Sequence, residues 1–208
     1  MSLELHYFDF DRGGRGFPIR AALHHGKIVY SDVRFTFSEF QEKKKQGLYP
    51  TGLPILKLPS GKEITQSVAI LRYVGKRCGL YPPDPETALL CDSIIDTVQD
   101  CMAKCPQDSD AGKKKAAREE YASTKMKAFC TNIESTMEGT WTAGEDFSIA
   151  DLYLFFLTDM VLTGSFDYVP TTYFSENGFS KLLEMDAKVR RHPMITEYCA
   201  SLGKDANL

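Results

Sequence analysis

The chain has 208 residues, of which 43% are hydrophobic and 25% are charged, so it can bury a sizeable core as one large domain or two small ones. Its 25 basic and 28 acidic residues give a formal net charge of −3, which is too balanced for nucleic acid or an anionic membrane to be the main partner. A small neutral or anionic ligand is compatible with this balance.

The opening segment predicts a strand, a loop, a helix and a second strand. Residues 3–8 alternate and are rich in strand formers, and residues 9–16 contain three glycines, which are typical of a loop. Pro18 suits the first turn of a helix that continues to about residue 26. Residues 29–37 alternate as a second strand, and the right-handed crossover rule predicts that it runs parallel to the first.

The next segment predicts a hairpin and a second long helix. Residues 38–49 are polar and predict a loop or an irregular helix. Residues 53–58 and 63–64 predict two antiparallel strands around a tight turn, and residues 67–76 predict a helix with one apolar face. The order β-α-β-β-β-α, or β-α-β-α-β-β-α if the middle stretch is helical, is that of a thioredoxin-like domain.

Clustered prolines within residues 80–85 indicate a linker, because they stop a helix and favour extended backbone. The segments after it predict helices at residues 88–105, 113–137, 149–162, 182–189 and 194–202. We therefore predict an α/β thioredoxin-like domain over residues 1–80 and an all-α domain over residues 86–208.

The cysteines and histidines fit neither a redox pair nor a metal site. The six cysteines include no CxxC pair, which predicts reduced and mostly buried thiols. A thiol-disulfide oxidoreductase needs a cysteine at the start of its first helix, whereas the first cysteine here is Cys78. The four histidines lack zinc-ligand spacing, so we predict no metal. Residues 1–5 do not resemble a signal peptide, and no apolar run approaches the roughly 20 residues of a membrane span, so we expect a cytoplasmic protein without a membrane partner.

The local motifs resemble the glutathione transferase family, and most closely its sigma class. The matching segments run in order over most of the chain: Tyr7-Phe8, Arg15 with Pro18-Ile19-Arg20, residues 52–56, Gln66-Ser67 with residues 69–73, residues 92–100 and residues 147–151. The resemblance implies a thioredoxin-like domain that binds glutathione as a co-substrate, a helical domain that lines the electrophile site, and a homodimer.

Tyr7 and Arg15 are the residues to which the resemblance assigns catalysis. Tyr7 lies at the end of the first predicted strand, where its phenol can donate a hydrogen bond to the glutathione sulfur and favour thiolate over thiol. Lowering the thiol pKa by one unit takes about 1.4 kcal/mol, which one charge-assisted hydrogen bond can supply. Arg15 would add positive charge near the same sulfur. The alternatives are a purely structural tyrosine and an exposed loop arginine.

Two short segments are implied to bind the glutathione backbone. Gly52, Leu53 and Pro54 resemble the family's cis-proline step, which would turn the Leu53 backbone outward to pair with the cysteinyl part of the ligand; a trans proline is the alternative. Gln66 and Ser67 lie where a strand passes into a helix, so Ser67 and free backbone N–H groups suit the γ-glutamyl carboxylate. Ser67 can also serve as a simple N-cap.

Three further residues complete the implied binding site. Asp100 is implied to reach the ligand ammonium from the neighbouring subunit, so that a complete site requires a dimer; the alternative is a solvated helix residue. Phe40 and Lys44 are candidates to flank the glycine carboxylate, where the family has Trp and Lys. The lysine run 43–45 leaves the register open, and a solvated basic loop is the alternative.

The chain also departs from the sigma pattern. The loop from Tyr7 to Arg15 is two residues longer, and Phe17 replaces an acidic residue, so we expect altered electrophile access or an altered arginine contact. Sigma-like prostaglandin D synthases carry an aromatic residue shortly after the position of Asp100, whereas residues 101–107 contain none, which disfavours prostaglandin isomerisation. Outside the site, Ser148 and Asp151 predict a capping box that starts a buried helix.

The resemblance therefore predicts a detoxifying transferase that conjugates glutathione, as thiolate, to hydrophobic electrophiles. Residues 8–15, the side chains around residues 101–105 and the C-terminal end are expected to line the acceptor site. The alternatives are a ligand-binding or structural protein, as in lens crystallins derived from this fold, and a glutathione-dependent isomerase. Retention of Tyr7, Gln66, Ser67 and Asp100 favours the transferase.

Overall fold

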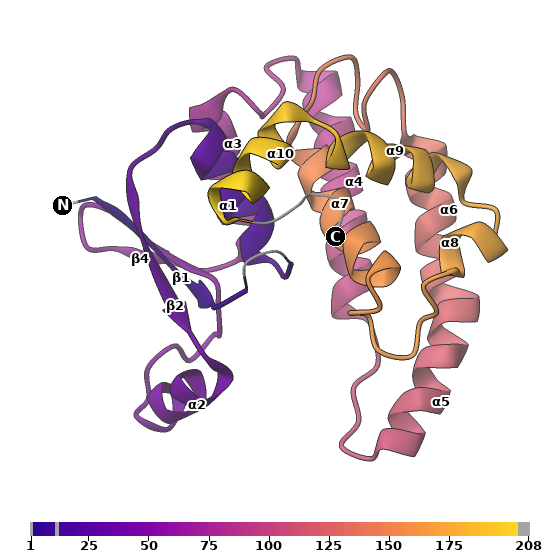
Figure 1. The fold of residues 1–208 in the computed structure, drawn as a ribbon, viewed down its shortest axis with the longest axis horizontal. Coiled ribbons are helices and arrows are strands. Elements are labelled where there is room, and N and C mark those ends of the chain that lie inside the picture. The colour runs from indigo at the N-terminus through magenta and orange to yellow at the C-terminus, as the bar shows by residue number, and fades with distance from the viewer. Residues whose placement is uncertain (1, 11–12, 204–208) are drawn as a thin grey trace. The chain divides into compact units, whose positions relative to one another are not determined.

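The structure is a computed structural model that describes residues 2–10 and 13–203 (Figure 1). The chain divides into two compact units by its internal packing. The first contains the chain up to Leu80 and the segment from Met194 onward, and the second contains Tyr81–Pro193. The C-terminal helix from Met194 thus groups with the first unit, whereas the sequence places it in the helical domain; residues 204–208 of that predicted domain lie outside the described residues.

The first unit is a small mixed sheet with helices. Its elements are β1 (Leu3–Phe8), α1 (Gly16–His25), β2 (Tyr30–Phe35), α2 (Phe37–Lys45), β3 (Ile55–Lys57), β4 (Glu63–Ile64), α3 (Ser67–Cys78) and, apart from its first residue, α10 (Pro193–Ser201). The order β-α-β-α-β-β-α decides between the two orders that the sequence left open.

The sheet has the strand order β2-β1-β3-β4. Strand β1 runs parallel to β2, from the pair Leu3 and Tyr30 onward, and antiparallel to β3, with His6 opposite Ile55. Strands β3 and β4 form the antiparallel hairpin. The parallel pair and the hairpin are both confirmed, and the carboxyl end of β1 leads directly into the glycine-containing loop.

Regularly spaced apolar side chains form the core between β1, α1 and α3. Leu5 of β1 and Ile19 and Leu23 of α1 are fully buried, as their alternating and helical spacings predict. Helices α1 and α3 pack against each other and share this core. Burying a side chain of this size contributes about 1.5–3 kcal/mol, so this apolar face holds α1 against its neighbours.

Helix α2 differs from the sequence prediction. The second strand was predicted to reach Phe37, with a loop or irregular helix after it, but the strand ends at Phe35 and a regular helix begins at Phe37. Thr36 is the N-cap, because its hydroxyl accepts the backbone N–H of Glu39 while the Glu39 carboxylate accepts the N–H of Thr36. This capping box satisfies two otherwise unpaired N–H groups and fixes where α2 begins.

The second unit is entirely helical apart from isolated bridges in one connecting segment. Its elements are α4 (Pro85–Ala103), α5 (Ala111–Tyr121), the π-helical segment η1 (Ala122–Met126), α6 (Lys127–Thr136), α7 (Ile149–Leu162), α8 (Tyr173–Glu176) and α9 (Ser180–Arg190). Helix α7 is buried on nearly every side and packs against α4 and α9. The predicted capping box of Ser148 and Asp151 is present at its start.

The helices of this unit depart from the prediction in three places. Helix α4 begins at Pro85, earlier than expected, because the Asp84 carboxylate accepts the N–H of Thr87 and proline suits the first helical position. The predicted helix 113–137 contains the π-helical segment η1. The short helix α8 was not predicted. Among the described residues, no helix combines the length and apolar character needed to span a bilayer.

Candidate functional site

Three predicted site residues lie toward the same end of the sheet. In the antiparallel register of β1 and β3, His6 lies opposite Ile55, and Tyr7 and Pro54 are the next residues of their segments at that end. In the register of β3 and β4, Leu56 lies opposite Ile64, and Gln66 follows Ile64 by two residues toward the same end. The strand directions therefore place Tyr7, Pro54 and Gln66, which lie far apart in the sequence, at one end of the sheet.

Tyr7 lies beneath the loop that follows β1. Only 5% of its surface is exposed, and its hydroxyl oxygen accepts the backbone N–H of Arg15 at 2.9 Å. A Cβ atom at Gly16 would come within 2.3 Å of the Tyr7 ring, so the loop can approach this closely only with glycine there. The Arg15 contact of Tyr7 is thus made by the main chain, and the Arg15 side chain is partly buried.

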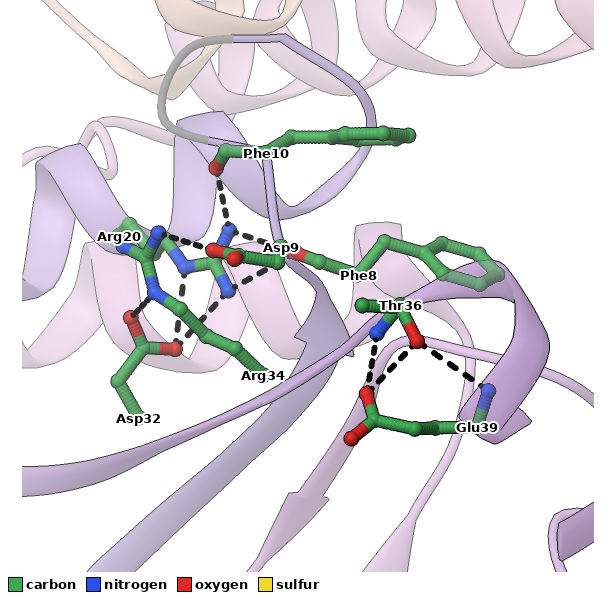
Figure 2. Close-up of polar contacts among 8 residues, drawn as sticks. All are labelled: Phe8, Asp9, Phe10, Arg20, Asp32, Arg34, Thr36 and Glu39. Atoms are coloured by element: carbon green, nitrogen blue, oxygen red, sulfur yellow. Dashed lines mark hydrogen bonds and ion pairs between the residues drawn. The ribbon is translucent and has the colours of Figure 1, made fainter.

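The loop is anchored by Arg20, whose role the sequence analysis did not predict. Arg20 is fully buried and donates hydrogen bonds to the carbonyl oxygen of Phe10 at 2.9 Å and to that of Phe8 at 3.3 Å. Its guanidinium is paired with the Asp32 carboxylate at 3.0 Å, as Figure 2 shows. The available sequence signal was an arginine among the apolar residues at the start of α1. A charge buried at such a position needs partners that satisfy it.

The Leu53–Pro54 peptide bond is cis, as the resemblance implied. Pro54 is buried, whereas Leu53 and Gly52 are partly exposed. Gly52 has a φ of 82°, a backbone conformation that glycine adopts readily. Leu53, next to this bond, is partly exposed, and its backbone is the candidate to pair with an extended ligand.

Helix α3 starts at Ser67, and its first turn faces the same end of the sheet. Gln66, not Ser67, is the N-cap, so the alternative of a simple serine cap is wrong. Gln66 has a φ of 73°, which is uncommon for a residue with a side chain, and among the described residues its side chain makes no capping hydrogen bond. A helix N-terminus with buried Ser67 beside it favours an anionic ligand group.

The two predicted glycine-carboxylate residues both lie on α2 and differ in exposure. Phe40 is 7% exposed and packs edge-on against Phe8, with ring centroids 5.2 Å apart. Its ring offers packing but no hydrogen-bond donor. Lys44 is exposed, whereas the Lys43 ammonium lies 5.5 Å from the Phe35 ring centroid.

Asp100 belongs to the second unit. It is exposed near the end of α4 and accepts a hydrogen bond from Lys104 at 2.6 Å, one helical turn away. Asp100 also lines a pocket of about 590 Å³ between α4 and the segment η1–α6, whose other lining residues are Ser93, Asp96, Thr97, Lys125, Ala128, Phe129 and Asn132.

Burial disfavours the thiolate form of five of the six cysteines, because it raises the pKa of each. All six, which lie in the described part of the chain, are free thiols. Burial raises the pKa of Cys91 to about 12 and that of Cys101 to about 11, so both stay protonated near neutral pH. A catalytic cysteine has a lowered pKa instead. Among the described residues, no group of three or more His, Cys, Asp or Glu side chains is arranged to hold a metal ion.

Comparison with known proteins gives matches over nearly the whole chain. Residues 95–202 match the family described as glutathione S-transferase, C-terminal domain. Glutathione S-transferase 2 of Manduca sexta is 30% identical over 171 residues, which cover 79% of this chain and 77% of the relative. S-crystallin SL11 of Nototodarus sloanii is 28% identical over 207 residues, 95% of each chain.

The fold has close structural neighbours as well. The solved structure of prostaglandin synthase D of Nilaparvata lugens superimposes with a TM-score of 0.76 at 25% identity, and the alignment covers 95% of this chain and 96% of that one. The mixed sheet followed by a helical unit is thus the glutathione S-transferase fold. The family match spans more than half of the chain, and the similarity to the Manduca sexta enzyme extends over both units. The chain belongs to the glutathione S-transferase family.

Proposed function

We propose that this chain is a sigma-class-like glutathione transferase, which conjugates glutathione to hydrophobic electrophiles in the cytoplasm as a detoxifying reaction. The observation that carries the proposal is that Tyr7, Pro54 and Gln66 lie toward the same end of the sheet, where α3 begins. Glutathione is the proposed ligand of these residues because the chain belongs to the glutathione S-transferase family. The six free cysteines are consistent with a reducing compartment.

Three parts of glutathione have proposed partners in the first unit. The Leu53 backbone beside the cis peptide bond pairs with the cysteinyl part, as an added strand would. The γ-glutamyl carboxylate binds at the start of α3, where Gln66, Ser67 and the first-turn N–H groups meet. Lys44, on exposed helix α2, attracts the glycine carboxylate, and the buried Phe40 shapes the wall beside it.

Tyr7 and Arg15 act on the sulfur. The Arg15 N–H donates to the Tyr7 oxygen at 2.9 Å, and a phenol that accepts such a bond becomes a stronger donor through its own proton. Tyr7 donates to the sulfur, the thiol proton passes to solvent, and the thiolate remains. The thiolate attacks an electron-poor carbon, a C–S bond forms, and in a substitution the leaving group departs with its electron pair. The Arg15 side chain adds positive charge.

The second unit contributes through a partner subunit in this proposal. Asp100 of the partner binds the γ-glutamyl ammonium, which makes a homodimer necessary for a complete site. Its i+4 ion pair with Lys104 is exposed and therefore weak enough to be exchanged for a ligand ammonium.

Passage over immobilised glutathione, followed by conjugation to 1-chloro-2,4-dinitrobenzene with Tyr7→Phe alongside, tests the proposal. Retention with Tyr7-dependent turnover is expected. Retention without turnover would support the glutathione-dependent isomerase or a carrier instead. Failure to bind would support the structural alternative, which is favoured by the 28% identity to an S-crystallin over 95% of the chain.

A further inference from the structure

We propose that Glu4, His6 and Tyr49, here called the Tyr49 anchor, position the Leu53 backbone for the cysteinyl part of glutathione. The inference rests on the proposed transferase function and adds three positioning residues to its glutathione site. All three lie outside the segments that carry the resemblance to the sigma class. They act through the turn that leads to Leu53 and take no part in the chemistry at the sulfur.

The imidazole of His6 is held at both ring nitrogens. His6 is 8% exposed, its Nε2 lies 3.2 Å from a Glu4 carboxylate oxygen, and its Nδ1 lies 3.0 Å from the Tyr49 hydroxyl. Glu4 and His6 are two residues apart on β1 and therefore share one face of the strand. Lys57 lies opposite Glu4 in the register with β3, and its ammonium is 3.7 Å from the same carboxylate oxygen.

These partners decide which group donates to Tyr49 and which accepts from it. An ionised carboxylate only accepts, so Nε2 of His6 carries a proton, and in the neutral ring Nδ1 keeps its lone pair. The Tyr49 hydroxyl therefore donates to Nδ1. Burial, together with the carboxylates of Glu63 and Glu4, raises the pKa of the Tyr49 phenol, so the phenol keeps the proton that this bond needs.

The backbone of Tyr49 is strained, and the anchor accounts for it. Its φ is 55°, in the left-handed region that bulky side chains rarely adopt. Its ring packs against three others, with centroids 5.5 Å from Phe35, 5.8 Å from His6 and 6.4 Å from Phe40. A strained residue persists only where its surroundings determine its conformation, and strain of this kind is common at ligand-binding segments.

The turn after Tyr49 connects the anchor to the ligand site. The Gly52 N–H donates to the Tyr49 carbonyl at 3.0 Å, which closes a turn of four residues. Proline in the second position, here Pro50, and glycine in the fourth suit such a turn. Leu53 follows directly, so its backbone keeps its place only while Tyr49 stays docked on β1.

The expected effect falls on glutathione binding and not on turnover. When a binding site is formed for only a fraction of the time, the apparent Kd rises by the inverse of that fraction. Once glutathione saturates the protein, Tyr7 still stabilises the thiolate, so kcat stays close to the wild-type value.

Calorimetry with glutathione and turnover assays of Tyr49→Phe test the proposal, with Tyr173→Phe as the matched control. Both variants remove one buried hydrogen bond of a phenol, and the bond of Tyr173, to the Ala122 carbonyl, lies in the second unit. We expect Tyr49→Phe to raise the Kd and KM for glutathione about threefold to fivefold, with kcat changed by less than about twofold. Tyr173→Phe should bind glutathione as the wild-type protein does.

Two substitutions of His6 test the hydrogen bond separately from the ring. The amide oxygen of asparagine can take the place of Nδ1, whereas the amide of glutamine takes the place of Nε2. His6→Asn should therefore keep most of the affinity for glutathione, and His6→Gln should lose as much as Tyr49→Phe. The double variant of Tyr49→Phe and His6→Gln should lose little more than either single one, because both remove the same bond.

Amide hydrogen exchange measured by NMR reports on the turn itself. Without ligand, the Gly52 amide should exchange about threefold to fivefold faster in Tyr49→Phe than in the wild-type protein, and at the wild-type rate in Tyr173→Phe. Faster exchange together with the raised Kd would connect the anchor to the turn and the turn to the ligand.

Wild-type affinity in both Tyr49→Phe and His6→Gln, or an equal loss in Tyr173→Phe, would overturn the anchor while leaving the proposed function in place. A loss of kcat with an unchanged Kd would overturn it as well. If the wild-type protein does not bind glutathione, the proposed function fails and this inference fails with it. Circular dichroism of each variant precedes titration; should His6→Gln not fold, the comparison of Tyr49→Phe with Tyr173→Phe decides alone.

Discussion

At the scale of single residues, the Tyr7 hydroxyl has one observed contact and one proposed role. It is nearly buried, it accepts the Arg15 N–H, and it closes the loop onto the end of β1. A hydroxyl can accept and donate at once, so the same group that orders the loop can also stabilise a thiolate. Removing the oxygen therefore affects the ligand sulfur and the loop together.

We predict that Tyr7→Phe lowers kcat about tenfold to a hundredfold at about pH 6.5 and much less at about pH 9. The reason is that the phenol lowers the pKa of the bound thiol, so its loss raises that pKa by about one or two units. The pH profile of kcat should shift to higher pH accordingly. Tyr73→Phe, an exposed tyrosine of α3, is the matched control. An unchanged profile would remove Tyr7 from the mechanism.

Tyr198 on α10 is buried like Tyr7, but its hydroxyl is not hydrogen-bonded to any described residue. It is 4% exposed, burial raises the pKa of its phenol, and its hydroxyl has no hydrogen-bond partner in the described part of the chain. We predict that Tyr198→Phe raises the free energy of unfolding by about 1 kcal/mol, because it removes a buried unsatisfied group. Urea unfolding measures this change.

The buried Tyr173 provides the comparison for Tyr198. Its hydroxyl donates to the Ala122 carbonyl at 2.8 Å, so Tyr173→Phe should lower the free energy of unfolding by about 1 kcal/mol. Effects of the same sign in the two variants would contradict the assignment of a partner to one hydroxyl and not to the other.

At the scale of elements, two capping boxes of the same type lie in very different surroundings. The Asp151 carboxylate at the start of α7 is fully buried and accepts the N–H and hydroxyl of Thr142 as well as those of Ser148. The Glu39 carboxylate at the start of α2 accepts the N–H and hydroxyl of the exposed Thr36. The first box ties a connecting segment to the helix, whereas the second caps a surface helix alone.

We predict that Asp151→Ala lowers the free energy of unfolding by about 3 kcal/mol, because it leaves buried N–H and O–H groups without an acceptor. Glu39→Ala should have a clearly smaller effect, since water replaces the lost acceptor at an exposed helix end. Thermal and urea unfolding of both variants measure the difference. A comparable loss in the two would show that burial does not decide the strength of these caps.

The sequence predicts best those elements of the fold that have a clear apolar pattern. Strand β1 and helix α7 follow directly from alternation and from a long apolar run, and their predicted bounds match the structure. Helix α2, the π-helical segment η1 and the short helix α8 depend on a capping pair or on local packing, which apolar periodicity does not record.

The candidate site divides in a similar way. Tyr7, Pro54 and Gln66 were predicted from the resemblance, and the directions of β1, β3 and β4 place them toward the same end of the sheet. The stacking of Phe37 on Phe8 was not predicted, because Phe37 was assigned to the end of a strand and the two rings meet only in three dimensions. Arg20 was likewise noticed only as part of a motif.

At the scale of the whole molecule, the central question is whether one chain holds a complete site. The proposed glutathione contacts of the first unit leave the ligand ammonium without a carboxylate, and Asp100 of a second subunit is the proposed acceptor. We predict that Asp100→Ala weakens glutathione binding about tenfold, as expected for loss of a charged hydrogen bond. Calorimetry with glutathione measures this. Glu86→Ala, an exposed acid on the same helix, is the control and should bind as the wild-type protein does.

Mixing two defective proteins then decides whether Asp100 acts across the dimer. In a heterodimer of Tyr7→Phe and Asp100→Ala subunits, one site receives both substitutions and the other receives Tyr7 from one subunit and Asp100 from its partner. If the site is shared, subunit exchange at equal amounts, assayed with glutathione well below its Kd, should add about a quarter of the wild-type rate to the residual rates of the two parents, because half of the dimers are mixed and each holds one intact site. If Asp100 acts within its own chain, each site of the mixed dimer keeps one substitution and mixing restores nothing. Light scattering before mixing establishes whether the 23.4 kDa chain is dimeric, and an active monomer would contradict the shared site directly.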